Sequence, residues 1–437
     1  MALRIVSFLL AGIISGISSA QVLTLDQAIR SGLDNNRQLK ISGYKVALAG
    51  IKYKEAVDLA LPSLKASGSY TRLSDVDQPK IQFPGAAEPV ALFPVYVNNY
   101  AARVSLSETL FSGFRLKYAM ESQQLLQRAA QLDATRDRDE VVFSIISAYF
   151  NLYKLEQSIK IVDENLRSLD QHISDAQKLE EQGTLLHNDV LKLQLQRSNT
   201  ELSRMDLENN LSIAEYDFNI LIGNNEKTVV VIDSSVIKEM DPLKTLDVYL
   251  GDALNNRSDL QAINTRSKSL ENNLKVAKNS YYPQLAVAAN YYDARPNPRV
   301  IPPQDKFVTT WDAGVVLTWD LMNLYANKHN VADSRIQLQQ IGESVHQAED
   351  GIKMEVNRDY LNCRQAAEKI RVMTSGLQQA EENDRLVNAR FRNALALTSD
   401  VIDANAALLQ ARVNLTLAKA DACVNYYRLM KSAGTLK

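Results

Sequence analysis

The chain of 437 residues contains two copies of one pattern, and this duplication restricts the possible folds more than any other feature. Gly183 to Val190 (Gly-Thr-Leu-Leu-His-Asn-Asp-Val) aligns with Ala394 to Val401 (Ala-Leu-Ala-Leu-Thr-Ser-Asp-Val), about 211 residues further on. At the same offset, Gly223 aligns with Gly434. Each copy combines two strand-like segments with a long helical hairpin, so the chain is predicted to fold as two repeats of one unit.

The N-terminus has the organisation of a secretory signal peptide. Arg4 supplies the positive charge, an apolar run covers residues 5–17, and Ser18-Ser19-Ala20 offers a small-residue cleavage site. The apolar run is too short to cross a bilayer as a helix, which needs about 20 residues. A short membrane anchor is the alternative. We assign residues 1–20 as a signal peptide and expect the mature chain to begin at Gln21.

The composition argues against several classes of protein. Charged residues make up 23% of the chain and the net charge is −2, so the basic footprint of a nucleic-acid-binding protein is absent. Beyond the signal peptide, no apolar run reaches about 18 residues, so no transmembrane helix is predicted. The four histidines lack partners at zinc-site spacing, and there is no Gly-rich phosphate loop or Gly-x-Ser-x-Gly motif. We expect no metal, no cofactor and no enzymatic activity.

Four segments alternate between apolar and polar residues with the period of a β-strand, and a proline-containing loop separates the members of each pair. They cover about 63–76 and 95–111 in the first copy, and about 284–294 and 307–321 in the second. Trp311 and Trp319 bracket the apolar face of the last segment and are the only tryptophans. Eight residues of tilted strand span roughly 20 Å, close to the apolar band of an outer-membrane barrel. A soluble sheet would also carry this alternation, but a lipid-facing strand explains both tryptophans.

Each strand pair is followed by a helical hairpin of unusual length, over about 116–221 and 326–432. The outgoing helices, about 116–181 and 326–392, contain no proline. Sixty-six helical residues span roughly 100 Å, and helices of this length require lateral packing, as in a coiled coil.

Further helices are predicted ahead of the strand pairs and a connecting element between the copies. Residues 23–60 and 245–281 have helical periodicity, and Pro62 and Pro283 end them. Residues 223–245 interrupt the helical pattern and are assigned to a mid-body connecting element. The domains are therefore a first repeat over 21–222, this connection, and a second repeat over 246–437.

Four strands cannot close a membrane barrel, because spanning barrels have at least about eight. An open sheet edge in lipid leaves backbone groups unpaired, at a cost of several kcal/mol each. If the strands lie in a membrane, several chains must combine, and three copies supply about twelve strands around a wet lumen. The predicted fold is mainly α with a small β part: a duplicated strand–strand–long hairpin forms a trimeric 12-stranded outer-membrane β-barrel continued by a periplasmic α-helical barrel.

At the strand pairs, the hairpins and their tips, the chain resembles the TolC-type outer-membrane efflux family over essentially the whole mature sequence. The first hairpin tip, with Gly183-Thr184 and Asp189-Val190, fits one family tip. The most specific residues are at the second tip, Arg390-Phe391-Arg392-Asn393-Ala394 followed by Thr398-Ser399-Asp400-Val401-Ile402-Asp403-Ala404.

The resemblance implies a homotrimeric exit duct in the outer membrane of a Gram-negative bacterium, extending into the periplasm. Outer-membrane lipid surrounds its barrel, with Trp311 and Trp319 in the aromatic girdle. An inner-membrane transporter and a periplasmic adaptor (membrane fusion) protein deliver substrates, as in tripartite efflux or type I secretion. The implied adaptor-docking tips contain Gly183, Thr184, Asp189, Ala394, Leu395, Thr398 and Ser399. The alternative, a periplasmic or surface coiled-coil structural protein, explains the helices but leaves the strands unexplained.

The resemblance also places Asp400 and Asp403 where carboxylates of the family ring the pore constriction. Residues three apart on a helix share a face, so three chains would aim about six carboxylates at a narrow opening, which attracts cations. The alternative is that both aspartates only favour the N-terminal end of the return helix through its dipole. At the first tip, Lys192 takes the place of Asp403, so the tips differ in charge.

The second hairpin departs from the family pattern at two positions and carries both cysteines of the chain. Ala394 replaces the family's tip glycine, so this turn is expected to be less tight. Ala396 stands where one family member carries a latching arginine, and whether Arg390 or Arg392 replaces that latch is left open. Cys363 and Cys423, on the two helices of the second hairpin, are expected to be small buried residues, with a disulfide as the alternative.

Overall fold

The computed structural model describes residues 22–74, 80–91, 95–237 and 242–436, and the predicted signal peptide lies outside these residues. The chain divides into two compact units, each built from both halves of the sequence. The sheet unit comprises Ser42–Ala134 and Ser258–Glu349. The hairpin unit comprises the described residues up to Ile41, Thr135–Arg257, and those from Asp350 onward.

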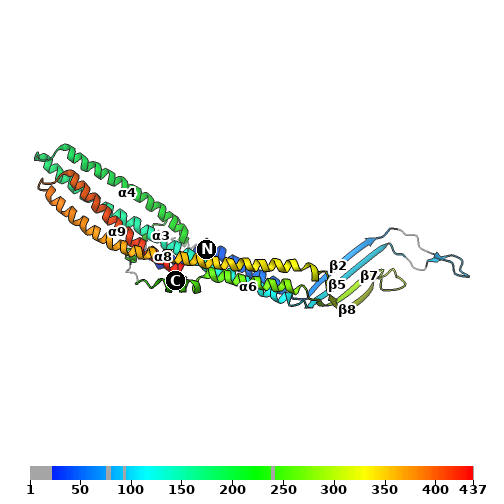
Figure 1. The fold of residues 1–437 in the computed structure, drawn as a ribbon. Coiled ribbons are helices and arrows are strands. Elements are labelled where there is room, and N and C mark those ends of the chain that lie inside the picture. Colours follow the sequence, from blue (N-terminus) through cyan, green and yellow to red (C-terminus); the bar gives the residue numbers. More distant parts are fainter. Residues whose placement is uncertain (1–21, 75–79, 92–94, 238–241, 437) are drawn as a thin grey trace, which may run out of the picture. The chain divides into compact units, whose positions relative to one another are not determined.

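The sheet unit contains a four-stranded antiparallel sheet in the order β2-β5-β7-β8 (Figure 1). The strands are β2 (Ser63–Arg72), β5 (Asn98–Phe111), β7 (Gln284–Arg295) and β8 (Val308–Thr318). Pairing of β5 with β7 joins the two halves of the chain in one sheet. Within the described residues, β2 and β8 have no second strand neighbour, so the sheet is open at both edges. A two-residue pair, β3 (Lys80–Ile81) with β4 (Val90–Ala91), lies in the β2–β5 connection.

The strand register gives the sheet one apolar and one polar face. Val104, Tyr291 and Trp311 are cross-strand neighbours, and the adjacent row is Ser105, Asn290 and Asp312. Because side chains alternate between the two faces of a strand, these rows face opposite sides. The apolar face stays exposed on all four strands. Its exposed large side chains include Leu64, Tyr70, Val104, Leu106, Tyr291, Trp311, Val315 and Leu317.

Three strand boundaries differ from those predicted. β8 ends at Thr318 instead of continuing to 321, because Asp320 accepts hydrogen bonds from the backbone N–H groups of Met322 and Asn323 and opens a turn into α7 (Asn323–Ala326). β5 begins at Asn98 rather than 95, and β2 ends at Arg72 rather than 76.

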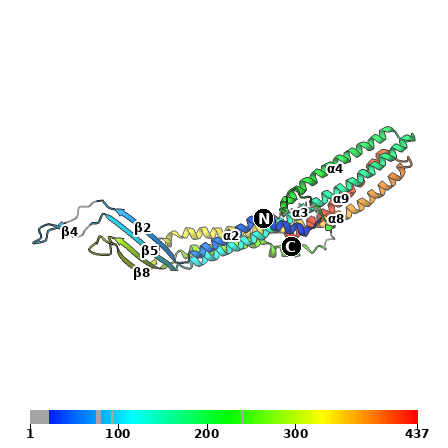
Figure 2. The same cartoon turned by 180° about the vertical axis from the view of Figure 1, so that it is seen from behind.

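Within the sheet unit, helices adjoin one end of the strands. They are α2 (Arg37–Asp58) from Ser42 onward, α6 (Ser258–Asn279) and the first parts of α3 (Arg115–Glu181) and α8 (Lys328–Phe391). Figure 2 shows α2 beside the first part of α3. α3 and α6 approach closely through small polar residues: the Ser122 hydroxyl lies 2.8 Å from that of Ser269 and donates to the Asn273 Oδ1 at 2.7 Å.

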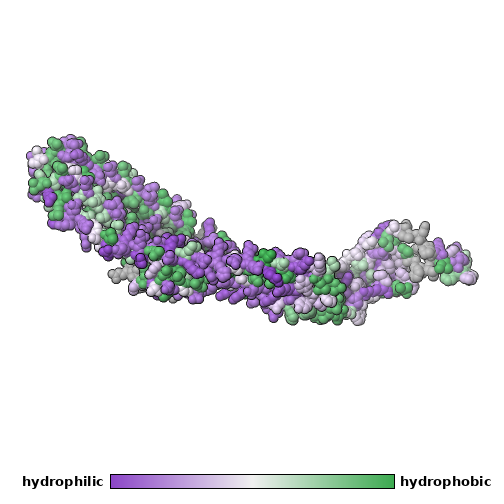
Figure 3. All heavy atoms as spheres, viewed as in Figure 1, coloured by the Kyte–Doolittle hydropathy of each residue, from purple (hydrophilic) through white to green (hydrophobic). Residues whose placement is uncertain are grey.

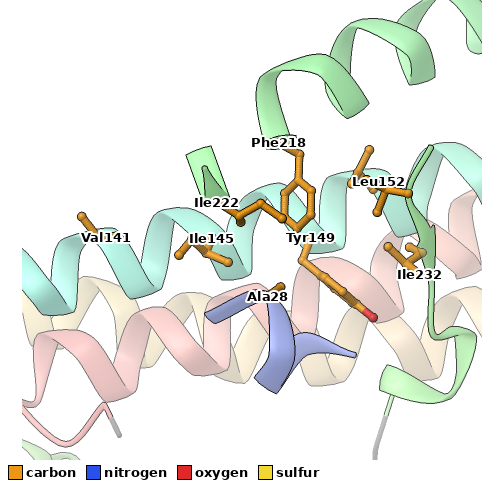
Figure 4. Packing of buried hydrophobic residues seen from close by; sticks show 9 residues of the cluster. Ala28, Val141, Ile145, Tyr149, Leu152, Phe218, Ile222 and Ile232 are labelled. Atoms are coloured by element: carbon orange, nitrogen blue, oxygen red, sulfur yellow. The ribbon is translucent and has the colours of Figure 1, made fainter. Parts of the chain in front are cut away.

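The hairpin unit holds the remaining lengths of α3 and α8 with their return helices, α4 (His187–Ile222) and α9 (Thr398–Ser432) (Figure 1). Its main core lies around Tyr149, which packs with Ala28, Ile145, Phe218 and Ile222 (Figure 4). The Tyr149 hydroxyl donates to the Leu23 carbonyl at 2.8 Å and accepts from the Asp233 N–H at 3.0 Å. It thereby ties β1 (Val22–Leu23) to β6 (Val231–Ile232), which pair in parallel; a short 3-10 turn, η1 (Ser234–Val236), follows β6.

The helices predicted over 23–60 and 245–281 are each broken in two. α1 (Leu25–Asn35) is separated from α2 at Asn36, and α5 (Leu246–Asn256) is separated from α6 at Arg257. Both breaks are places where the C-terminus of a return helix docks. Asn36 Nδ2 donates to the Leu221 carbonyl at 3.3 Å, and Arg257 Nη1 donates to the Ser432 carbonyl at 3.3 Å. The prediction of two continuous helices was wrong, because local periodicity does not reveal this tertiary contact.

Candidate functional sites at the hairpin ends and on the sheet

The two hairpin ends have the same backbone geometry. At the first, the Gly183 N–H bonds the Glu180 carbonyl at 2.8 Å and the Thr184 N–H bonds the Leu179 carbonyl at 2.9 Å. At the second, Ala394 and Leu395 make the equivalent bonds to Phe391 and Arg390, both at 2.9 Å. Such bonds end a helix through one left-handed residue.

Ala394 adopts that left-handed conformation with φ of +57°, close to the +74° of Gly183. The expectation of a looser turn at Ala394 was therefore wrong. The turn keeps its hydrogen bonds and places a Cβ in a region that disfavours it by about 1–2 kcal/mol.

Apolar residues from all four helices hold the hairpin ends together. The buried cluster consists of Ala176, Val190, Leu193, Phe391 and Val401. Val190 and Val401 each follow an aspartate in the repeated Asp-Val pair, so the apolar residue of the pair faces the core. This explains why valine recurs at both tips.

Asp400 and Asp403 lie in the first two turns of α9, and both are exposed. Asp400 Oδ2 accepts the Leu397 N–H at 3.1 Å, so the helix-end role considered from the sequence is present. Among the described residues, no cation lies within ion-pair distance of either carboxylate. At the first tip, by contrast, Lys192 Nζ lies 3.0 Å from Asp189 Oδ1. The second tip therefore presents two negative charges where the first presents a neutral pair.

The remaining tip residues divide into exposed and buried ones. Gly183, Thr184, Leu395 and Ser399 are exposed, whereas Thr398 is buried and its Oγ1 lacks a partner among the described residues. Leu186 and Leu397 precede α4 and α9 and are 73% and 70% exposed. Helix caps favour Ser, Thr, Asp or Asn, and leucine supplies no capping oxygen. The sequence interpretation missed these two leucines, although the signal was visible: an apolar residue occupies the cap position of both return helices.

A polar layer lies behind the tips, between the two hairpins. Arg392 Nε lies 3.6 Å from Asp175 Oδ2, so Arg392 rather than Arg390 links the hairpins by an ion pair. Further along, Asn165 Nδ2 donates to Asn405 Oδ1 at 2.9 Å. Burial lowers the pKa of His172 on α3 and raises the pKa of Asp384 on α8. The charge of Asp384 raises the pKa of His172, and the charge of His172 lowers the pKa of Asp384, so each interaction opposes the effect of burial.

Trp311 and Trp319 occupy the exposed side of the sheet but not one continuous strand. Trp311 lies on the apolar face of β8, whereas Trp319 follows the strand and donates its indole N–H to the Tyr281 carbonyl at 3.1 Å. Large exposed apolar side chains surround the junction of strands and helices, and Figure 3 shows an apolar patch there. The sequence interpretation missed most of this belt, whose members include Leu61, Phe114, Tyr282, Leu321, Met322 and Tyr325.

The described part of the chain contains no cluster of potential metal ligands. None of its helices combines the length and apolarity needed to cross a bilayer. Cys363 and Cys423 are buried free thiols, as expected, and burial raises the pKa of Cys423 to about 11.

Comparison with known proteins identifies the family. The model of the outer membrane efflux protein family matches residues 28–224 and 249–435. The chain belongs to this family. No individual curated protein sequence matches it significantly.

Solved channel structures share the fold of this outer membrane efflux protein. CusC is 17% identical and superposes with a TM-score of 0.79, over 94% of this chain and 92% of that one. VceC, an outer membrane protein of Vibrio cholerae, is 16% identical with a TM-score of 0.77, over 94% and 96%. The open state of the MtrE outer membrane channel of Neisseria gonorrhoeae is 15% identical with a TM-score of 0.73, over 94% and 89%.

Membership of this family places the protein in the outer membrane as a passive channel rather than an enzyme. It excludes the alternative of a coiled-coil structural protein. The long hairpins are the channel's α-helical part.

Proposed function

We propose that this protein is the exit duct of a tripartite efflux or type I secretion system. It works as a homotrimer. An inner-membrane transporter and a periplasmic adaptor deliver the substrates, and the trimer passes them through the outer membrane. The observation that carries the proposal is the four-stranded sheet, which exposes an apolar face and, in the part of the chain that the structure describes, is open at both edges.

The sheet order explains why copies of the chain close the barrel. All neighbouring strands in the order β2-β5-β7-β8 are antiparallel, so the two edge strands run in opposite directions. β8 of one copy can therefore pair with β2 of the next in the antiparallel sense that the rest of the sheet uses. Every residue of β2 is exposed, so the edge is free to accept this partner. Three copies bring about twelve strands, with the apolar face toward lipid and the polar face toward the lumen.

The membrane girdle in this arrangement contains Trp311, Trp319 and the exposed belt at the junction of strands and helices. Tryptophan and tyrosine favour the interface between hydrocarbon and water because one end of each ring is polar. Trp319 matches this preference through the hydrogen bond of its indole N–H.

The hairpin tips supply the constriction and the docking surface. Asp400 and Asp403 line the narrow end, where their uncompensated charges attract cations. The adaptor docks on the exposed tip residues Gly183, Thr184, Ala394, Leu395 and Ser399 and on the partly exposed Asp189. Thr398, predicted to belong to this surface, is buried and supports it from beneath. Exposed apolar groups on a polar surface commonly mark protein contacts, so Leu186 and Leu397 extend this docking surface.

The constriction is tested in planar bilayers with purified protein. Wild-type protein is expected to form discrete channels that multivalent cations block. The double variant D400A/D403A is expected to show higher conductance and weaker block, because it removes the ring of carboxylates. D189A is the matched control, since Asp189 occupies the place of Asp400 at the first tip but is ion-paired with Lys192. Unchanged cation block in D400A/D403A would remove both aspartates from the pore assignment.

A further inference from the structure

The polar face of the sheet carries a basic cluster organised around one aromatic ring. Arg103 of β5 lies over the Tyr292 ring at 5.2 Å from its centroid, and Arg299 of the β7–β8 connection lies over the same ring at 4.2 Å. Cation–π contact of this kind orders a guanidinium without neutralising it. Arg103 and Tyr292 are direct cross-strand neighbours, so the register of β5 and β7 brings them together.

The connection that carries Arg299 is anchored to the sheet. Asn297 is 2% exposed, and its Nδ2 donates to the Val308 carbonyl at 2.7 Å while its Oδ1 accepts the Arg299 N–H at 2.9 Å. Arg299 Nη2 donates to Asp312 Oδ2 at 2.5 Å, and Asn290 Nδ2 donates to Asp312 Oδ1 at 2.7 Å. The backbone and the guanidinium of Arg299 are both fixed above the polar face.

The charges of this face do not cancel. Alternation along the strands places Lys65, Arg103 and Asp312 on it, and Arg299 reaches it from the connection. This gives three cations and one carboxylate per chain within the described residues. Arg103 donates through Nε and Nη2 to the neutral Asn290 Oδ1, at 3.3 and 2.8 Å, so its charge has no carboxylate partner there.

We propose that Arg103 and Arg299 form an anion-binding station on the lumen wall, which takes small organic anions bearing carboxylates. The inference rests on the proposed function, because the polar face encloses a lumen only when three copies close the barrel. Six guanidiniums then surround the passage, and a ring of like charges sets which ions enter. Arginine suits carboxylates because its planar donors match their two oxygens, and each guanidinium here keeps donors that the fold does not use.

The test measures ion selectivity and block in planar bilayers. With a KCl gradient, the reversal potential of R103Q/R299Q channels is expected to shift toward cation selectivity. Citrate is the carboxylate probe, and its block of wild-type channels is expected to weaken about tenfold or more in this variant, since the charged hydrogen bonds to its carboxylates are lost. D312N removes the carboxylate that pairs with Arg299 and is expected to shift the reversal potential in the opposite direction.

Two control variants separate charge from general damage. Arg295 is the last residue of β7, directly before the same connection, but it pairs with Asp305 at 2.8 Å and lies over Tyr100 on the apolar face. R295Q is therefore expected to leave citrate block unchanged. R103K/R299K keeps the charges and is expected to keep the wild-type reversal potential.

The failures of the two proposals are distinguishable. R103Q/R299Q channels that conduct with wild-type reversal potential and wild-type citrate block overturn the anion-binding station alone. Wild-type protein that inserts into the bilayer without forming channels overturns the proposed function, and the station with it. If R103Q/R299Q does not assemble, R299Q alone is measured, with a smaller shift in the same direction expected and no shift counting against the station.

Discussion

At the scale of single residues, the polar layer behind the tips makes the stability of the hairpin unit depend on pH. Burial lowers the pKa of His172 below its ordinary value of 6.5. The unfolded chain therefore takes up a proton near pH 6.5 while the folded chain stays neutral at this position. The stability that neutral His172 supports is present above about pH 6.5 and is lost as the pH falls below it.

H172Q is expected to reduce this acid destabilisation, because glutamine has no proton to take up. Thermal unfolding followed by circular dichroism at pH 7.5 and 5.5 measures the effect. The difference between the two pH values should be smaller in H172Q than in wild type. H346Q is the control, since His346 is an exposed residue of α8. If H172Q, like H346Q, keeps the wild-type difference in stability between pH 7.5 and 5.5, His172 is not the source of the acid destabilisation.

A second prediction at this scale concerns the backbone conformation of Ala394. Its φ of +57° lies in the region that glycine adopts without strain. A394G is expected to stabilise the hairpin unit by about 1 kcal/mol, whereas G183A, at the equivalent left-handed position of the first tip, is expected to destabilise it by a similar amount. Chemical denaturation of both variants compares them directly, and a stabilising G183A would contradict the account.

At the scale of elements, the sequence predicted the long helices well because their signals are local. α3 begins and ends within about one residue of its predicted bounds, since apolar periodicity and the Gly183 turn mark them. The breaks at Asn36 and Arg257 were missed, because neither is a proline or glycine and each depends on a distant helix end. The end of β8 was missed because an aspartate turn follows directly after the alternating pattern.

These breaks lead to a prediction for Gly223 and Gly434, which follow the two return helices with φ of +74° and +69°. A Cβ on Gly223 would clash with the Asn35 side chain, and one on Gly434 would lie 3.0 Å from the Arg257 backbone nitrogen. G223A and G434A are each expected to destabilise the hairpin unit by more than about 1 kcal/mol.

Gly251 of α5 supplies the control, because an added Cβ there has no described atom within 4 Å apart from the local backbone of its own helix. G251A is expected to be neutral or stabilising by up to about 1 kcal/mol, since alanine favours helix more than glycine. Thermal unfolding measures the stability of the three variants. Equal changes in stability for G223A and G251A would show that docking of the return helix does not depend on the glycine.

At the scale of the whole molecule, the sequence indicated a membrane sheet completed by other copies, since four alternating segments are too few for a barrel. It also indicated Asp400 and Asp403 through a resemblance. The basic cluster at Tyr292 could not be predicted, because it requires the register of β5 with β7 and a folded connection that carries Arg299. The exposed belt at the strand–helix junction was missed for a related reason: its members come from four separate segments that only the fold brings to one level.

The central claim is that the four-stranded sheet is completed by two further copies of the chain. Light scattering coupled to size-exclusion chromatography in detergent measures the number of protein chains per particle, after subtraction of the bound detergent. We expect three chains per particle. A folded monomer that stays monodisperse in buffer without detergent would contradict the account.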